Sequence, residues 1–303
     1  MSANKNKAAA IALAVVMGLL AIKVLVAAVG GSLSILAQAA DSFLDIFAVT
    51  ISLFSLRIAA KPADDDHHFG HGKVEGLAAI IQATLIVLTS GLIVFAAVQR
   101  FTAGATVELT EAGILVMAVS IVASIALSRY LMRVARETDS LSLLANARNI
   151  SADAYSAGAV MLGLVALRLT GLAVIDPILA IGVALYILRT AYTIIRSALD
   201  QLIDAKLPDE EEAIIKAAIT EHKQEIVGFH RLRTRKAGDE RQIDLHIVMP
   251  RHVVLEEVHR FCDHLEQEIQ VNLGRSHLTI HCEPCKTTCH ACEVICSIRS
   301  DKP

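Results

Sequence analysis

The segment Ala40-Asp41-Ser42-Phe43-Leu44-Asp45 places two aspartates one helical turn apart inside the apolar run Leu33–Leu56. An ionisable side chain at membrane depth is costly, and such residues usually line a path for a substrate or a proton. At a spacing of i, i+4 both carboxylates project from the same face of one helix. The segment therefore predicts a membrane helix that carries an acidic site on one face.

A second polar pair repeats this spacing in a later apolar run. Asn149 and Asp153 are again four residues apart, within Leu144–Leu167. For Asn149 a simpler role is the alternative, because Asn side chains often link membrane helices only by hydrogen bonds. With Asp41 and Asp45, the two pairs offer four oxygen-bearing side chains from two helices, and we expect them to form a metal cage inside the bilayer.

The composition also predicts a membrane protein. Of the 303 residues 54% are hydrophobic and none is Trp, and a net charge of only −3 gives no reason to expect nucleic acid as a partner. Six apolar runs precede the last third of the chain, and each is near the ~20 residues that a spanning helix needs. The runs are Ala8–Val29, Leu33–Leu56, Val74–Val98, Ala112–Met132, Leu144–Leu167 and Leu172–Ile195. We expect an integral α-helical membrane protein with six transmembrane helices in the lipid bilayer.

Basic residues predict the orientation of these spans. Lys5 and Lys7 precede the first run, which is long for the apolar region of a signal peptide, the alternative reading of this segment. Further basic residues flank every second loop, at Arg57, Lys61, Lys73, Arg129, Arg133, Arg136, Arg148, Arg189 and Arg196. Cytoplasmic loops carry such an excess of Lys and Arg. Both termini are therefore expected in the cytoplasm.

The last third of the chain has the pattern of a small soluble domain. A boundary near Asp204–Pro208 divides the chain into a membrane domain at 1–204, a cytoplasmic domain at 205–285 and a Cys-rich tail at 286–303. Helical patterns cover Glu211–His222 and Val254–Val271, and strand patterns cover Val227–Arg235, Gln242–Pro250 and His277–Cys282. The order α-β-β-α-β predicts an α+β domain with its helices on one face of a sheet.

The loop Pro62–Glu75 is a second concentration of metal-ligand chemistry. It holds three aspartates and three histidines within the eight residues from Asp64 to His71. Carboxylate oxygens and imidazole nitrogens are the usual ligands of first-row divalent metals. A solvated acidic turn is the alternative. The expected position at the cytoplasmic mouth of the carboxylate site favours a metal site.

Five of the six cysteines lie close together at the end of the chain, at Cys282, Cys285, Cys289, Cys292 and Cys296. In a domain expected to face the reducing cytosol they do not suggest a disulfide framework. We expect thiolate binding of zinc or sensing of a soft metal. A small buried apolar face is one alternative, and an iron–sulfur cluster is another, although the spacing differs from the usual bacterial run.

Taken together, these motifs resemble the cation diffusion facilitator family, close to its bacterial zinc- and iron-exporting branch. The matching positions are Ala40–Asp45, Pro62–Glu75, Asp153, Leu207–Glu211, Gly228–Arg235, His246, His259 and Ile280–Cys285. The resemblance implies a homodimer of six-span protomers in a bacterial inner membrane, with cytoplasmic domains shaped like small metallochaperones. It also implies export of divalent metal cations in exchange for protons.

The resemblance assigns metal ligands residue by residue. The transport site would consist of Asp41, Asp45, Asn149 and Asp153, and the loop site of Asp64, His67 and His71. The cytoplasmic domain would bind Zn²⁺ through His230, His246, His259, His281 and Glu283, the last where relatives often have Asp. Lys73 and Asp204 match positions that form a charge interlock near the dimer interface of relatives.

One departure from the family pattern concerns the metal. Zinc-selective relatives usually carry His where this chain has Asn149. An all-oxygen cage is harder than one with an imidazole and suits Mn²⁺ or Fe²⁺ better. Zn²⁺, Fe²⁺ and Mn²⁺ therefore all stay open for the transport site. Because Asn cannot titrate, proton exchange would depend on the three aspartates.

Two other classes of function remain as alternatives. The chain could be a non-transporting membrane metal sensor or scaffold that acts through its cytoplasmic domain, although the intact aspartates favour transport. It could also be a membrane metallo-enzyme. Neither an HExxH motif nor a nucleophile–base pair occurs in the apolar runs, so we expect no enzymatic activity.

Overall fold

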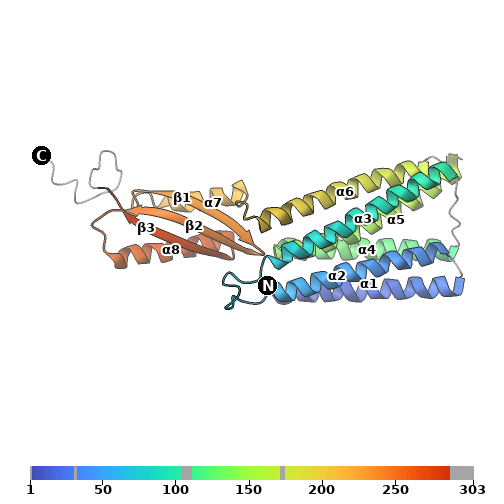
Figure 1. The fold of residues 1–303 in the computed structure, drawn as a ribbon, viewed down its shortest axis with the longest axis horizontal. Coiled ribbons are helices and arrows are strands. Elements are labelled where there is room, and N and C mark those ends of the chain that lie inside the picture. Colours follow the sequence, from blue (N-terminus) through green and yellow to red (C-terminus); the bar gives the residue numbers. More distant parts are fainter. Residues whose placement is uncertain (1, 31–32, 104–110, 171–174, 287–303) are drawn as a thin grey trace. The chain divides into compact units, whose positions relative to one another are not determined.

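The computed structural model describes residues 2–30, 33–103, 111–170 and 175–286. The chain forms two compact units, Met1–Leu202 and Ile203–Pro303. The first consists of long helices, and the second combines helices with a sheet (Figure 1). Each unit has its own hydrophobic core.

The first unit contains six helices, and they confirm the six apolar runs as helical segments. They are α1 (Ser2–Gly30), α2 (Leu33–Ala59), α3 (Val74–Ala103), α4 (Glu111–Glu137), α5 (Leu141–Thr170) and α6 (Ile175–Leu202). Helix α1 packs on α2 and α4, α3 packs on α6, and α5 contacts α2, α3, α4 and α6. Alanines such as Ala8, Ala12 and Ala147 are fully buried at these contacts. Small side chains let the helix backbones approach closely, as is typical of membrane helices.

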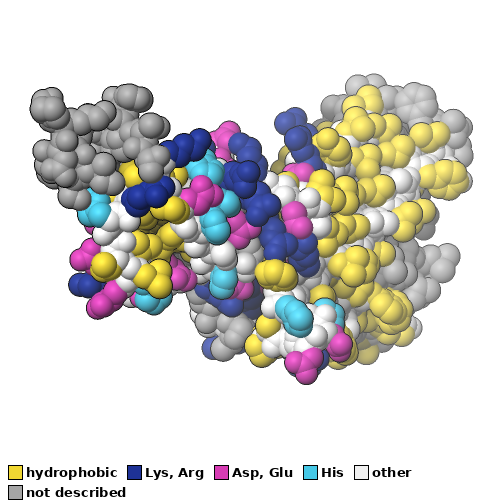
Figure 2. Space-filling model, turned by 60° about the vertical axis from the view of Figure 1, so that its left-hand side comes forward, with side chains coloured by type: hydrophobic (Ala, Val, Ile, Leu, Met, Phe, Trp, Pro, Cys, Tyr) yellow, Lys and Arg dark blue, Asp and Glu magenta, His cyan; other side chains and the backbone are white. Residues whose placement is uncertain are grey.

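Four of the six helices are long and apolar enough to cross a membrane within the residues that the structure describes. These segments are Asn4–Val26, Val74–Gln99, Met117–Glu137 and Ile178–Leu202. Large apolar side chains, among them Phe54, Leu92 and Phe95, are exposed on the outside of the unit. Figure 2 shows hydrophobic side chains covering one face of the helical unit. Such a surface suits hydrocarbon rather than water, so the helical unit is a membrane domain.

The second unit confirms the predicted order α-β-β-α-β. It contains α7 (Asp209–Glu221), β1 (Gly228–Ala237), β2 (Glu240–Met249), α8 (Leu255–Leu273) and β3 (Ser276–Pro284). The sheet has the order β1-β2-β3, with β1 antiparallel and β3 parallel to the central β2. Gly238, at a φ of 69°, allows the tight turn between the paired residues Ala237 and Glu240.

Alternation along β2 gives this sheet one buried and one open face. Ile243, Leu245 and Ile247 are almost fully buried in a core with residues of α7 and α8. Successive side chains of a strand point to opposite faces. Asp244 and His246 therefore lie on the face away from the helices, and this open face carries a cluster of histidines described below.

Candidate metal centres

Helices α2 and α5 bring together two of the residues predicted for the transport site. Asn149 of α5 is 7% exposed, and its Nδ2 atom donates a hydrogen bond of 2.9 Å to Oδ1 of Asp45 of α2. Asp153 follows Asn149 by one turn on the same face of α5, and its Oδ2 atom is buried. Asp41 precedes Asp45 by one turn in α2, but its side chain lies outside the described residues. A half-buried carboxylate and a buried amide thus face each other between two helices.

The polar face of α5 continues beyond this pair toward the start of the helix. Ser142 and Asn146 are fully buried, and with Asn149 and Asp153 they form one stripe at spacings of four, three and four residues. Both amide atoms of Asn146 are buried and have no hydrogen-bond partner among the described residues. This extension was not predicted, although the i, i+3 and i, i+4 spacing of Ser142, Asn146 and Asn149 in the sequence indicates it.

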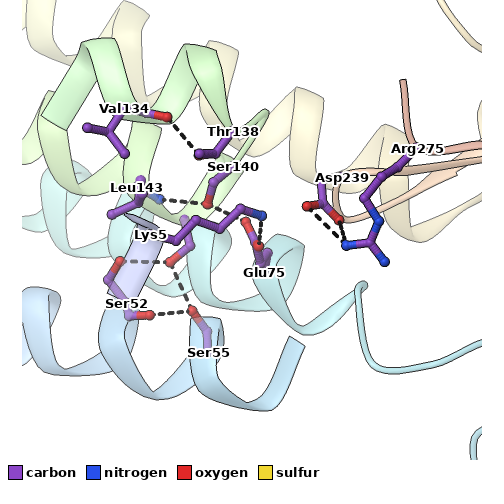
Figure 3. A network of polar contacts seen from close by, with 11 residues as sticks. Lys5, Ser52, Ser55, Glu75, Val134, Thr138, Ser140, Leu143, Asp239 and Arg275 are labelled. Carbon is purple, nitrogen blue, oxygen red and sulfur yellow. Dashed lines mark hydrogen bonds and ion pairs between the residues drawn. The ribbon is translucent and has the colours of Figure 1, made fainter. Parts of the chain in front are cut away.

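Serines of α2 meet this stripe at Ser142, and Figure 3 labels two of them, Ser52 and Ser55. The hydroxyl of Ser142 donates to Oγ of Ser52 over 3.0 Å and lies 2.9 Å from Oγ of Ser55. Gln82 of α3 donates to Ser142 from its Nε2 atom over 3.3 Å. Three helices therefore share a buried polar layer on the side of Asn149 that faces the start of α5.

A buried ion pair lies at the end of the helical unit where α3 and α5 begin. Nζ of Lys5 is 2.9 Å from Oε1 of Glu75, and the two residues are 6% and 2% exposed. Ser140, which immediately precedes α5, donates to the other carboxylate oxygen of Glu75 (Figure 3). This contact ties the starts of α1, α3 and α5 together by charge.

The loop between α2 and α3 gathers the three residues predicted for it. Asp64, His67 and His71 place one ligand atom each within 4.8 Å of one another. Oδ1 of Asp64 lies 3.1 Å from Nδ1 of His67, and Oδ2 lies 3.4 Å from Nε2 of His71. Nδ1 of His71 is buried and has no hydrogen-bond partner in the described part of the chain. One carboxylate and two imidazoles in this arrangement form a donor set that suits a borderline divalent cation.

The two histidines of this loop favour the ionised form of the Asp64 carboxylate. Desolvation raises the pKa of Asp64, but hydrogen bonds from the backbone and ring of His67 and the charges of both histidines outweigh it. The net pKa is below the ordinary value of an aspartate. Asp64 is therefore an anion near neutral pH, as a metal ligand must be.

The open face of the sheet in the second unit carries three histidines in a row. The strand register pairs His230 with His246 and His246 with His281. Nδ1 of His246 is 2.8 Å from Oε1 of Glu283, and Nε2 of His230 is 3.4 Å from Oε2 of the same carboxylate. His281 approaches Glu283 less closely, at 3.8 Å. The hydrogen bond from His246 holds the pKa of Glu283 below its usual value, so this cluster also presents an anion between imidazoles.

His259 is not part of that cluster within one chain. It lies on α8, is exposed, and its Nδ1 atom is 3.7 Å from Oδ1 of Asp263. Helix α8 packs on the opposite face of the sheet from His246. Within one chain, His259 therefore lies on a different face of the sheet from the other histidines predicted to bind zinc in this domain. Spacing along the chain does not show which face of a sheet a helix covers.

Of the five cysteines close together at the end of the chain, Cys282 and Cys285 belong to the folded domain. Sγ of Cys282 in β3 lies 3.4 Å from Sγ of Cys262 in α8, and Cys285 is buried. Burial, together with the contact to Cys282, raises the pKa of Cys262 to about 12. A thiol with that pKa keeps its proton at neutral pH and binds metal poorly. Cys289, Cys292 and Cys296 lie outside the described residues.

A further group of possible metal ligands lies between α7 and α8 and was not predicted from the sequence. His222 of the α7 C-cap meets His264 and Glu268 of α8, with one ligand atom of each within 4.8 Å of the others. Apart from the spacing of His264 and Glu268, the sequence holds no signal for this group, because its members are far apart along the chain.

Comparison with known proteins places this arrangement in a family. Residues 9–203 match the cation efflux transmembrane domain, and residues 207–285 match the cytoplasmic domain of cation efflux proteins. The cation-efflux pump FieF of Pectobacterium atrosepticum is 34% identical over 254 residues, which are 84% of each chain. FieF of Escherichia fergusonii is 34% identical over 280 residues, which are 92% of this chain and 93% of that one.

A solved structure of the transporter CzrB in its zinc form is 35% identical over 27% of this chain and 92% of that chain, at a TM-score of 0.26. The two domain matches and the FieF pumps extend over nearly the whole sequence. These matches show that the protein belongs to the cation diffusion facilitator family. The members of the family that it resembles are cation-efflux transporters and not enzymes.

Proposed function

We propose that this protein exports divalent transition-metal cations from the cytoplasm in exchange for protons, with all six helices α1–α6 crossing a bacterial inner membrane. The observation that carries the proposal is the contact of Asp45 of α2 with Asn149 of α5. Asp153 lies one helical turn after Asn149 in α5. A carboxylate on a half-buried helix face inside an apolar unit is costly unless it serves a substrate.

The chemistry of the site explains how metal and protons would exchange. A dehydrated dication needs anionic oxygen ligands, which Asp45, Asp153 and, by its spacing, Asp41 would supply. Without the metal, closely spaced carboxylates repel one another, and a bound proton relieves that repulsion. Metal entering from one side therefore displaces protons, and protons entering from the other side displace the metal. The amide nitrogen of Asn149 donates a hydrogen bond to Asp45, and its amide oxygen would be the ligand for a cation.

The cytoplasmic residues would act as accessory metal sites. The donor sets of Asp64, His67 and His71 and of His230, His246 and Glu283 each have the mixed nitrogen and oxygen character that zinc accepts. We propose that residues 205–285 bind zinc and join two protomers into a homodimer, in which exposed His259 would be available to the partner. The match of residues 207–285 to the cytoplasmic domain of cation efflux proteins supports this role for the second unit.

Metal flux into reconstituted vesicles tests the proposal. With an imposed pH gradient, the parent protein should accumulate Zn²⁺, Fe²⁺ or Mn²⁺, and Asp45→Asn and Asp153→Asn should abolish accumulation. Asp200→Asn is the matched control, because Asp200 is an exposed aspartate of α6. Parental flux in either site variant would remove these residues from the mechanism. Metal binding by the parent without any flux would favour the sensor or scaffold instead.

A further inference from the structure

Helices α7 and α8 hold a cluster that belongs to none of the sites described for transport. His264 and Glu268 are four residues apart on α8, so their side chains lie on one face of that helix. His222 comes from the end of α7, and its Nε2 atom is 3.0 Å from Oε2 of Glu268. Its ring is nearly perpendicular to that of His264, with the ring centroids 5.3 Å apart. Two elements therefore direct three donor groups at one point.

The surroundings of His222 have the form that supports a metal-bound imidazole. Its second nitrogen, Nδ1, is 2.9 Å from Oε1 of Glu225. Histidines that bind metals usually donate the second ring N–H to a carboxylate or carbonyl, which fixes the tautomer and the orientation of the ring. Phe261 packs edge-on against the same ring, with the centroids 5.4 Å apart. His222 is thus oriented on two sides, with Nε2 directed at Glu268.

Burial gives the cluster one protected side and one open side. The side chains of His222 and Glu268 are 15% and 22% exposed, whereas His264 is exposed. A cation held by these three groups would keep a coordination position open to water. Two imidazoles, one carboxylate and one water are a ligand set that zinc adopts.

A simpler account is that His222 only forms an ion pair with its two glutamates. Desolvation lowers the pKa of His222, but hydrogen bonds to Glu225 and Glu268 outweigh it and leave the pKa above its usual value. The ion pair explains those two contacts, but it gives no role to the imidazole of His264. A dependence of metal binding on His264 therefore distinguishes the two accounts.

We propose that His222, His264 and Glu268 bind a divalent cation of the zinc class and thereby fasten the end of α7 to α8. The site is separate from the histidines on the open face of the sheet, because α7 and α8 cover the other face. It would load cytosolic metal independently of the transport site. Its occupancy is measured by binding and not by flux, so it can be tested whether or not transport is shown.

Equilibrium dialysis of the full chain in detergent, with reduced thiols and micromolar free zinc, tests this site. His264→Ala leaves both hydrogen bonds of His222 in place, so the fold should persist while about one zinc ion per chain is lost. Glu268→Gln should lose the same amount. His277→Ala is the matched control, because it removes another exposed histidine of the same domain.

Hydrogen exchange gives a second readout that does not depend on counting metal ions. Zinc should slow exchange of the backbone amides at residues 219–222 in the parent and in His277→Ala, but not in His264→Ala. The proposal is overturned if His264→Ala binds as much zinc as the parent, if His277→Ala loses as much as His264→Ala, or if α7 gains protection in all three proteins.

Discussion

At the scale of single residues, we expect Asn149 to set the selectivity of the transport site between zinc and manganese. Its amide meets Asp45 at 2.9 Å in a position where an imidazole would supply a nitrogen ligand. Asn149→His should therefore raise the ratio of zinc to manganese flux, by about tenfold if the ligand change is worth about 1.4 kcal/mol. Both fluxes are measured in one vesicle preparation.

Asn149→Asp is the control for that experiment, because it keeps the cage all-oxygen and should leave the ratio near that of the parent. If Asn149 only packs between α2 and α5, the His variant would instead lower both fluxes together. A ratio that does not change in Asn149→His would contradict a ligand role for this residue.

Residue spacing along the sequence predicted some clusters of possible ligand side chains and missed others for a physical reason. Asp64, His67 and His71 are close in the sequence, and the structure brings them together as expected. His222 and His264 become neighbours only because the apolar faces of α7 and α8 pack on the same side of the sheet. Local patterns do not report such tertiary contacts. For the same reason, the sequence does not show that His259 and His246 lie on different faces of the sheet within one chain.

At the scale of elements, the buried contact of Lys5 with Glu75 holds the starts of three helices. Breaking a buried pair by removing one partner leaves an uncompensated charge, which typically costs about 3–5 kcal/mol. Glu75→Ala should therefore destabilise the helical unit by about that amount. Unfolding in mixed detergent micelles, followed by tyrosine absorption, measures the change.

The double variant Lys5→Met with Glu75→Leu is the control that separates the cost of an unpaired buried charge from the cost of lost packing. It removes both charges and fills the space with apolar atoms, so it should recover much of the lost stability. If Glu75→Ala and the double variant were equally stable, or if Glu75→Ala cost less than about 1 kcal/mol, the ion pair would have no structural role.

The elements themselves were predicted well, but the order of the strands in the sheet was not predicted. Apolar runs and alternation located every helix and strand of the described chain, because burial imposes a period of 3.6 or 2 on the sequence. The observed helices extend past the apolar runs, as at the end of α4, where Arg133, Arg136 and Glu137 interrupt the run of apolar residues. The central position of β2, which aligns His230, His246 and His281, depends on strand order. Sequence periodicity does not encode that order.

At the scale of the whole molecule, the two units can be observed separately. The four tyrosines, Tyr130, Tyr155, Tyr186 and Tyr192, all lie in the helical unit, and the chain has no Trp. Near-ultraviolet signals from tyrosine therefore report only on the helices. Amide hydrogen exchange in β1–β3 reports on the cytoplasmic sheet. With these two signals, the stabilisation that one metal gives to each unit can be measured separately in the same sample.

Zinc should stabilise both units through different residues. A ligand that binds only the folded state at a hundred times its Kd adds about 2.7 kcal/mol of stability. His246→Ala should reduce the zinc-induced protection of the sheet and leave the shift of the tyrosine transition unchanged, because His246 lies in the cytoplasmic cluster. Asp45→Asn should do the reverse, since Asp45 faces Asn149 inside the helical unit. If either variant removed both effects together, zinc would be bound at one shared site and the two units would not load metal independently.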